Sequence, residues 1–207
     1  MNRGIHSRGY LPHWDFAKSV QAITFRLADS VPKKTIKSWK RELASLPDDK
    51  QRQEQLHRLI AHHEDAGHGE AVLADPACAS LVQNELIRKH AGSYKLIDWV
   101  IMPNHVHVLV RLLNGYSLTP VVQRWKGASA VHINRHLNRS GKLWESDYYD
   151  RCIRDMDHYH DSIAYIRNNP MKAGLCEKPE EWRFSSAGIS WSADFSPPES
   201  PSNVHAD

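Results

Sequence analysis

The spacing of apolar residues along the chain changes several times between a strand-like and a helix-like pattern. Short runs rich in β-branched and aromatic residues predict strands, whereas apolar residues three or four positions apart predict helices. Strands are expected at residues 20–27, 94–102, 105–112 and 143–148. Helices are expected at residues 33–46, 50–63, 76–90, 118–137 and 155–169.

The order of these elements predicts an α+β fold. Strand, helix, strand, strand, helix, strand is the ferredoxin-like (RRM-like) order, an antiparallel sheet with helices on one face and the first and third strands at its centre. The helices within residues 33–75 would form an inserted helical hairpin, and the helix at 155–169 an extra C-terminal helix. We expect the hairpin to be a solubilising ornament, with a DNA clamp as the alternative.

The two ends of the chain are expected to lie outside the folded domain. Residues 1–19 would form an N-terminal arm, residues 20–189 one domain, and the Ser- and Pro-rich residues 190–207 a disordered tail. A length of 207 residues with 41% hydrophobic content suffices for one sizeable core. Neither a membrane-spanning apolar run nor an apolar signal region is present, so we expect a cytoplasmic protein.

Two histidines on one predicted strand are the first candidate for chemistry. Because strand side chains alternate between faces, His105 and His107 point to one side and Val106 and Val108 to the other. Two adjacent imidazoles can hold a divalent metal if a further ligand joins them. The alternative is a pair of hydrogen-bonded histidines on a polar sheet face.

The last predicted helix carries Tyr165 and Asn169, which lie one turn apart on the same face. If that face looks toward the histidines, the site gains a phenol and an amide oxygen. A tyrosine beside a metal can attack phosphorus, whereas a packing residue with its hydroxyl at the surface is the alternative. Pro170 disfavours helical geometry at Asn169, so we expect the helix to end there.

The charge of the chain is mild, with a net charge of +3 and a pI of about 8.7, and does not by itself indicate a nucleic-acid partner. Basic residues nevertheless cluster near aromatic ones, a combination that suits single-stranded DNA; a solvated helix face is the alternative. The three cysteines fit neither a disulfide framework nor a Cys-x-x-Cys zinc site. The candidate DNA-binding residues are Arg124, Lys126, Arg151, Arg154, Arg167 and Lys172.

Four segments in a fixed order resemble the REP-associated tyrosine transposases, a group within the single-tyrosine His-hydrophobic-His transposases of insertion sequences. The resemblance covers roughly residues 20–186, with a further similarity at residues 22–30. The segments are Trp99–His107, Leu143–Arg151, Tyr165–Leu175 and Trp182–Ser186.

This resemblance implies a metal-dependent endonuclease and strand transferase that acts on single-stranded REP-type hairpin DNA. His105, His107 and Asn169 would hold Mg²⁺ or Mn²⁺, and Tyr165 would form a 5′-phosphotyrosine intermediate. Trp182 would help to hold the DNA, with a core-capping tryptophan as the alternative. The neutral ligand set predicts weak metal affinity without a DNA phosphate. We expect a monomer, and a dimer that exchanges the tyrosine helix is the alternative.

Two other functions stay open at this point. One is a non-catalytic protein that binds REP hairpins and has kept the fold. The other is a structural or zinc-binding interaction domain, which the missing cysteine spacing disfavours. For the transposase, Tyr159 is the alternative nucleophile, six residues before Tyr165 on the same helix. Tyr148 and Tyr149 are further candidates.

Overall fold

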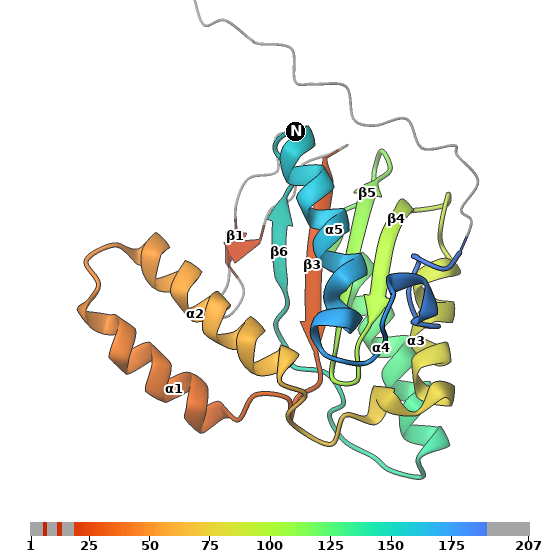
Figure 1. The fold of residues 1–207 in the computed structure, drawn as a ribbon, viewed down its shortest axis with the longest axis horizontal. Helices are drawn as coiled ribbons and strands as arrows, with labels where there is room; N and C mark the ends of the chain where they lie inside the picture. Colours follow the sequence, from red (N-terminus) through yellow and green to blue (C-terminus); the bar gives the residue numbers. More distant parts are fainter. Residues whose placement is uncertain (1–5, 8–11, 14–18, 190–207) are drawn as a thin grey trace, which may run out of the picture.

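The structure is a computed structural model that describes residues 6–7, 12–13 and 19–189 (Figure 1). The expected disordered tail at 190–207 and most of the expected arm at 1–19 lie outside the described residues. Within the arm, β1 (His6–Ser7) pairs antiparallel with β2 (Pro12–His13). None of the helices in the described part is long and apolar enough to cross a membrane.

A four-stranded antiparallel sheet forms the centre of the molecule. Its strands are β3 (Val20–Arg26), β4 (Tyr94–Ile101), β5 (His105–Leu112) and β6 (Tyr149–Cys152). Their order in the sheet is β4-β5-β3-β6, and β5 pairs with β3 along its length, ending at Arg26 opposite His105. The first and third strands of the predicted order therefore lie at the centre, as expected, and the two histidines are on a central strand.

Helices cover both faces of this sheet (Figure 1). They are α3 (Pro76–Ile87), α4 (Leu118–His136) and α5 (Met156–Lys172). Val106 and Val108 of β5 point into the core beneath α3 and α4. Leu109 packs instead with Ile166 of α5 on the opposite face. The alternation along β5 therefore turns the histidine face toward α5, the helix that carries Tyr165.

The inserted helical hairpin consists of α1 (Lys33–Glu42) and α2 (Asp49–Asp65), connected through a short 3₁₀ turn. The two helices pack through a small apolar cluster of their own, which includes Ile36 and Leu56. The carboxylate of Asp48 caps α2 by accepting a hydrogen bond from the backbone N–H of Lys50. The C-terminal end of α2 reaches the sheet beside β3 and β6 (Figure 1).

The expected strand at residues 143–148 is wrong, because β6 begins at Tyr149. Leu143, Trp144 and Tyr148 are buried in the core beneath α4, and the segment forms an isolated bridge between Trp144 and Leu27, the residue that follows β3. Apolar side chains that anchor an irregular segment give the same sequence signal as a strand, because composition does not reveal backbone pairing.

The expected end of the last helix at Asn169 is also wrong, because Pro170 lies inside α5. Proline removes one backbone hydrogen bond, yet the following bonds form: Ala173 N–H donates to the Asn169 carbonyl and Leu175 N–H to the Pro170 carbonyl. Gly174, at φ 69°, supplies the left-handed residue that ends the helix. Asn169 therefore stays helical and shares a face with Tyr165.

The packing of α5 on the histidine face can be tested with Leu109→Ala. Leu109 is fully buried, so the substitution is expected to lower the free energy of unfolding by about 2–5 kcal/mol, as measured by urea denaturation. Val131→Ala on the exposed side of α4, where the side chain is 57% exposed, is the control and should change it by less than about 0.5 kcal/mol. Equal effects of the two substitutions would contradict this packing.

Candidate functional site

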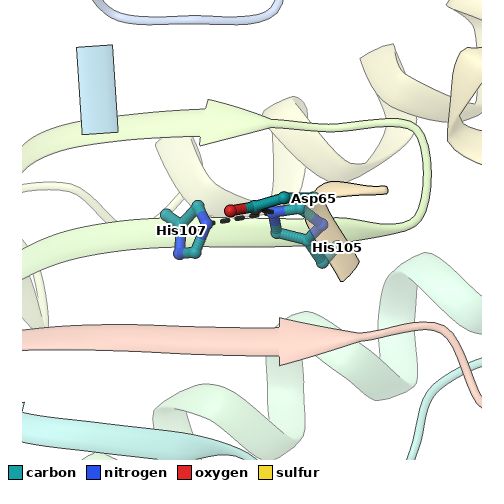
Figure 2. Close-up of side chains that lie close together, drawn as sticks. All are labelled: Asp65, His105 and His107. Atoms are coloured by element: carbon teal, nitrogen blue, oxygen red, sulfur yellow. Dashed lines mark hydrogen bonds and ion pairs between the residues drawn. The ribbon is translucent and has the colours of Figure 1, made fainter. Parts of the chain in front are cut away.

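His105 and His107 meet at their ring nitrogens in the middle of the sheet face (Figure 2). Their Nε2 atoms lie 3.0 Å apart, and both side chains are buried. Burial lowers the pKa of His105 to about 3 and the pKa of His107 well below its ordinary value. Both imidazoles are therefore neutral near pH 7, which is the form that binds metals.

Asn104 fixes which nitrogen of His105 carries the proton. The Asn104 side-chain amide Nδ2 donates hydrogen bonds to the backbone carbonyls of Glu64 and His68, each at 3.0 Å. Its Oδ1 atom must then face His105 Nδ1, 2.7 Å away, and an amide oxygen only accepts. The proton of His105 therefore lies on Nδ1, and Nε2 presents its lone pair.

Thr24 on β3 holds His107 in the same way, with its hydroxyl 2.7 Å from His107 Nδ1. If Nδ1 donates to this hydroxyl, both Nε2 atoms direct lone pairs at the same point. Two lone pairs at such a separation repel each other unless a proton or a cation lies between them. The pair can share a proton, or it can hold a metal ion.

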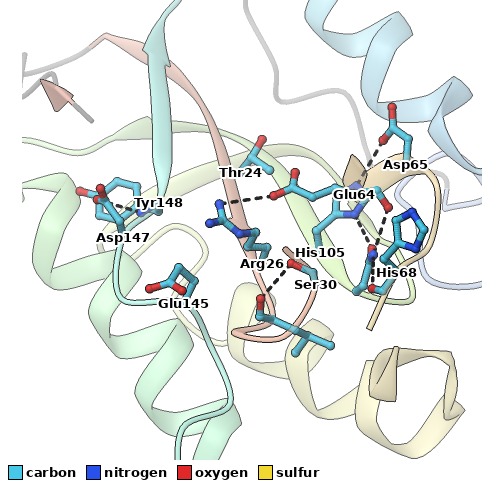
Figure 3. A network of polar contacts seen from close by, with 12 residues as sticks. Thr24, Arg26, Ser30, Glu64, Asp65, His68, His105, Glu145, Asp147 and Tyr148 are labelled. Atoms are coloured by element: carbon cyan, nitrogen blue, oxygen red, sulfur yellow. Dashed lines mark hydrogen bonds and ion pairs between the residues drawn. The ribbon is translucent and has the colours of Figure 1, made fainter. Parts of the chain in front are cut away.

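Asp65, the last residue of α2, adds a carboxylate to the histidine pair (Figures 2 and 3). Its Oδ1 atom lies 3.8 Å from His105 Nε2, and the ligand atoms of the three residues lie within 4.8 Å of one another. Because His105 is neutral, this contact is no ion pair. Burial raises the pKa of Asp65, and Oδ1 is a buried atom with no hydrogen-bond partner in the described part of the chain.

Asn169 of α5 reaches the same point from the other side. Its Nδ2 atom lies 3.2 Å from His107 Nε2, and its Oδ1 is buried and accepts no hydrogen bond from the described residues. The oxygen and nitrogen of an amide have nearly the same shape, so a half-turn of the group exchanges them. The three ligands predicted from the sequence therefore come together.

The donor set fits a divalent cation. Two neutral imidazole nitrogens, one carboxylate and one amide oxygen converge there, and two of the oxygens are buried without a partner, which is unfavourable unless a cation binds them. The sequence analysis missed Asp65 because nothing distinguishes it from the other charged residues of α2. Its carboxylate supplies the charge that the His-His-Asn set lacked, so the expectation of weak affinity no longer follows. The choice of Mg²⁺ or Mn²⁺ stays a prediction.

Tyr165 lies beside His107, with the two ring centroids 5.1 Å apart in an edge-on arrangement. The half-buried ring lines a cleft of about 540 Å³, together with His107 and Glu64. Burial raises the pKa of the phenol, and the nearby carboxylates of Asp65 and Glu64 raise it further. The phenol is therefore protonated at neutral pH.

The other candidate tyrosines occupy different positions. Tyr159 is buried between α5 and the sheet, and Tyr148 is buried on the opposite side beneath α4. Neither lines the cleft, whereas Tyr149 does. The Tyr149 ring is stacked on the ring of His57 from α2, with centroids 3.5 Å apart and planes 10° apart. Among these tyrosines, Tyr165 is the one whose ring contacts the histidine pair.

A buried network attaches the inserted hairpin to the sheet at this site (Figure 3). Arg26 Nη1 on β3 lies 3.5 Å from Glu64 Oε1, and both side chains are less than a tenth exposed. Burial raises the pKa of Glu64 to about 7, although the Arg26 guanidinium opposes that rise. Together with the Asn104 amide bonds, this contact holds the end of α2 against the sheet.

The predicted basic residues divide between the two faces of the sheet. Arg151 and Arg154 line the cleft, and Lys172 Nζ lies 5.2 Å from the centroid of the Tyr165 ring. Arg167 is held by the buried carboxylate of Asp98, with Nε 2.7 Å from Oδ2. These four residues belong to the side of the sheet that carries α5.

Three other predicted residues do not join the cleft. Arg124 and Lys126 lie on α4, across the sheet, and Lys126 Nζ donates to the backbone carbonyl of Ser146 at 2.9 Å. Burial lowers the pKa of Lys126 to about 8. Trp182 is half-buried and donates through Nε1 to the Ile101 carbonyl at 3.0 Å, which fits the core-capping alternative.

The contribution of Asp65 can be tested by replacing it with a neutral isostere. Asp65→Asn removes the only charged metal ligand of the proposed set and is expected to weaken Mn²⁺ binding by at least about 10-fold, as measured by titration calorimetry. Glu54→Gln, at an exposed position on the same helix, should leave the affinity unchanged. Unaltered affinity in Asp65→Asn would exclude Asp65 as a ligand.

The stability of the folded chain should depend on pH through His57. Burial lowers its pKa to about 4, so below an unfolded value of 6.5 the unfolded chain takes up a proton that the folded chain does not. Stability from this group is present above pH 6.5 and is lost as the pH falls. Between pH 6.5 and 5, the free energy of unfolding should fall by about 1–2 kcal/mol more in wild type than in His57→Phe, which keeps an aromatic ring but cannot titrate. Parallel urea-unfolding profiles would contradict this.

The sequence matches known transposases over part of its length. Residues 80–169 match the family model described as "Transposase IS200 like". A REP-associated tyrosine transposase of Escherichia coli (strain K12) is 25% identical over 97 residues, 47% of this chain and 56% of the relative. A Haemophilus influenzae protein provisionally described as a REP-associated tyrosine transposase is 26% identical over 103 residues, 45% of this chain and 58% of the relative. The match thus spans about half the length of these curated relatives.

A solved structure shares the fold. The structure of a REP-associated tyrosine transposase bound to a REP hairpin superposes with a TM-score of 0.57, covering 89% of this chain and 86% of that chain at 13% identity. The family match and the distant relatives therefore bear out the resemblance stated from the sequence, and the solved structure shows the shared fold. Residues 80–169 match the model of the IS200-like transposases, and the chain shows distant homology to the REP-associated tyrosine transposases over about half of its length.

Proposed function

We propose that this chain is a metal-dependent endonuclease and strand transferase of single-stranded DNA that acts on REP-type hairpins through Tyr165. The observation that carries the proposal is the convergence of the Nε2 atoms of His105 and His107 with Asp65 and Asn169, directly beside the half-buried Tyr165 ring. A protein that only binds DNA has no need of neutral, buried imidazoles next to a phenol.

Four side chains from three elements would hold Mg²⁺ or Mn²⁺: the two histidines from β5, Asp65 from α2 and Asn169 from α5. When bound, such an ion polarises a non-bridging oxygen of the scissile phosphate and stabilises the charge that develops there. Asn104 and Thr24 keep the two imidazoles oriented with Nε2 available. The cleft beside Tyr165 leaves room for the phosphate.

Tyr165 would act as the nucleophile. Its phenol oxygen gives up a proton and attacks phosphorus, and the bond from phosphorus to the 3′ oxygen of the preceding nucleotide breaks. That oxygen takes up a proton and leaves as a free 3′-hydroxyl, while the following strand stays attached as a 5′-phosphotyrosine. One phosphodiester replaces another, so its energy is retained for rejoining to a new 3′-hydroxyl.

The arrangement of the helices bears on the assembly. The candidate ligands and Tyr165 all come from one chain, and α5 packs on the sheet of its own chain. An exchange of the tyrosine helix between two copies is therefore unnecessary to complete the site, and we propose a monomer as the active form. The hairpin substrate is supported by the solved REP-associated tyrosine transposase of the same fold, which is bound to a REP hairpin.

A cleavage assay tests the proposal. Single-stranded hairpin DNA of the REP type, labelled at its 3′ end, is incubated with the protein and Mn²⁺ and separated on a denaturing gel. Wild type should form a slowly migrating covalent adduct that EDTA prevents and Tyr165→Phe abolishes, and His107→Ala should reduce it at least about 100-fold. Tyr116→Phe, at a tyrosine 47% exposed, is the matched control and should behave as wild type.

Two results would contradict the proposal. An adduct that persists in Tyr165→Phe would assign the nucleophile to another tyrosine, with Tyr149 the first to examine because it also lines the cleft. Tight binding of the hairpin by wild type without any cleavage would instead favour the non-catalytic DNA-binding protein.

A further inference from the structure

The cleft beside Tyr165 extends from the histidine pair toward the β6 edge of the sheet. One wall is α2, with His57; a second is β6, with Tyr149; and the third is the first half of α5. Since α2 belongs to the inserted hairpin, the insertion supplies one side of the cleft. The insertion thus forms one wall of this cleft.

The size of the cleft limits what it can hold. Its volume of about 540 Å³ lies within the range of about 300–1,000 Å³ that a single small molecule fills. An occupant of this size corresponds to one or two nucleotide units and not to an extended strand or a duplex.

A flat aromatic surface forms part of the wall. The rings of His57 and Tyr149 are stacked almost parallel, with centroids 3.5 Å apart. Burial and the nearby Arg151 guanidinium lower the pKa of His57 to about 4, so its ring is uncharged at neutral pH. An uncharged stacked pair offers a face on which a nucleobase can stack, and any base can do so.

Two guanidinium groups lie at the same cleft. Arg151 on β6 and Arg154 before α5 are exposed, and neither forms an ion pair with the described carboxylates. Other arginines differ: Arg26, Arg139 and Arg167 each pair with an acidic side chain. As far as the described residues go, both guanidinium groups can therefore receive a phosphate without breaking an ion pair.

Carboxylates on α5 oppose these cations and orient the occupant. Asp155 accepts a hydrogen bond from the His158 N–H as the cap of the helix, while Asp157 and Asp161 line the cleft one turn apart. A phosphate is repelled from the α5 side and attracted to the arginines. The base edge then faces the carboxylates, which accept hydrogen bonds from the exocyclic amino groups of adenine, cytosine or guanine, whereas thymine offers only its single ring N3–H.

We propose that α2 and β6 form a pocket for one unpaired deoxynucleotide next to the phosphate that Tyr165 attacks, with its base on the His57–Tyr149 stack and its phosphate on Arg151 and Arg154. This proposal rests on the proposed function and adds to it a base preference, against thymine, at one position of the strand. The inserted hairpin thereby contributes directly to substrate selection.

The test measures equilibrium binding and not cleavage. The protein carries Tyr165→Phe, and the probe is a fluorescein-labelled DNA stem-loop with four unpaired nucleotides on each side, each replaced in turn by an abasic site. At one or two adjacent positions the loss of the base should weaken binding about 5- to 100-fold in fluorescence anisotropy, the range that base–aromatic stacking gives. Thymine at that position should bind more weakly than cytosine.

Variants connect the sensitive position to the pocket. Tyr149→Ala and, independently, His57→Ala should remove most of the abasic effect, whereas Tyr149→Phe keeps the ring and should retain it. Asp161→Asn should reduce the difference between cytosine and thymine. Tyr116→Ala, at an exposed tyrosine outside the cleft, is the control and should leave both effects unchanged.

The outcomes separate this proposal from the one on which it rests. If wild type forms the covalent adduct but no abasic position depends on Tyr149 or His57, the pocket is wrong and the proposed function stands. If no adduct forms while the abasic effect depends on both residues, the pocket is a DNA-binding site of a non-catalytic protein. An abasic effect that persists in both alanine variants would overturn the pocket.

Discussion

The opposed ring nitrogens of His105 and His107 are the constraint around which the site is built. Two unprotonated nitrogens 3.0 Å apart inside a protein repel each other unless a proton or a cation lies between them. Asn104 and Thr24 fix the rings from behind, and α2 and α5 bring buried oxygen atoms without partners to the same point. Each of these features is costly alone, and a divalent cation bound at this point, as proposed above, would offset all of them.

Asn104 connects this constraint to the rest of the fold. Its side chain sets the protonation of His105 through Oδ1 and at the same time holds the end of α2 through Nδ2. The position of Asp65 therefore depends on the turn between β4 and β5. The buried contact of Glu64 with Arg26 attaches the same end of α2 to β3. The inserted hairpin is thus fixed to the sheet where the candidate metal ligands meet. The preceding turns of α2, which include His57, form a wall of the cleft.

The sequence predicted the features that depend on local periodicity. Alternation along residues 105–112 placed the two histidines on one face, and helical spacing placed Tyr165 and Asn169 together on another element. Residues 143–148 were misassigned because buried apolar side chains resemble a strand whether or not the backbone pairs. Asp65 was missed because only tertiary contacts bring it to the histidines. The predicted helix end at Asn169 was wrong because the packing of α5 overrides the local effect of Pro170. The pairing of His57 with Tyr149 is likewise invisible in the sequence.

The most direct test of the cation site is anomalous X-ray diffraction from crystals of the protein grown with Mn²⁺. The account predicts one strong anomalous peak about 2.0–2.3 Å from the Nε2 atoms of both His105 and His107, with Asp65 and Asn169 turned toward it. A peak bound elsewhere, or a histidine pair that keeps its direct Nε2–Nε2 contact at saturating Mn²⁺, would contradict it.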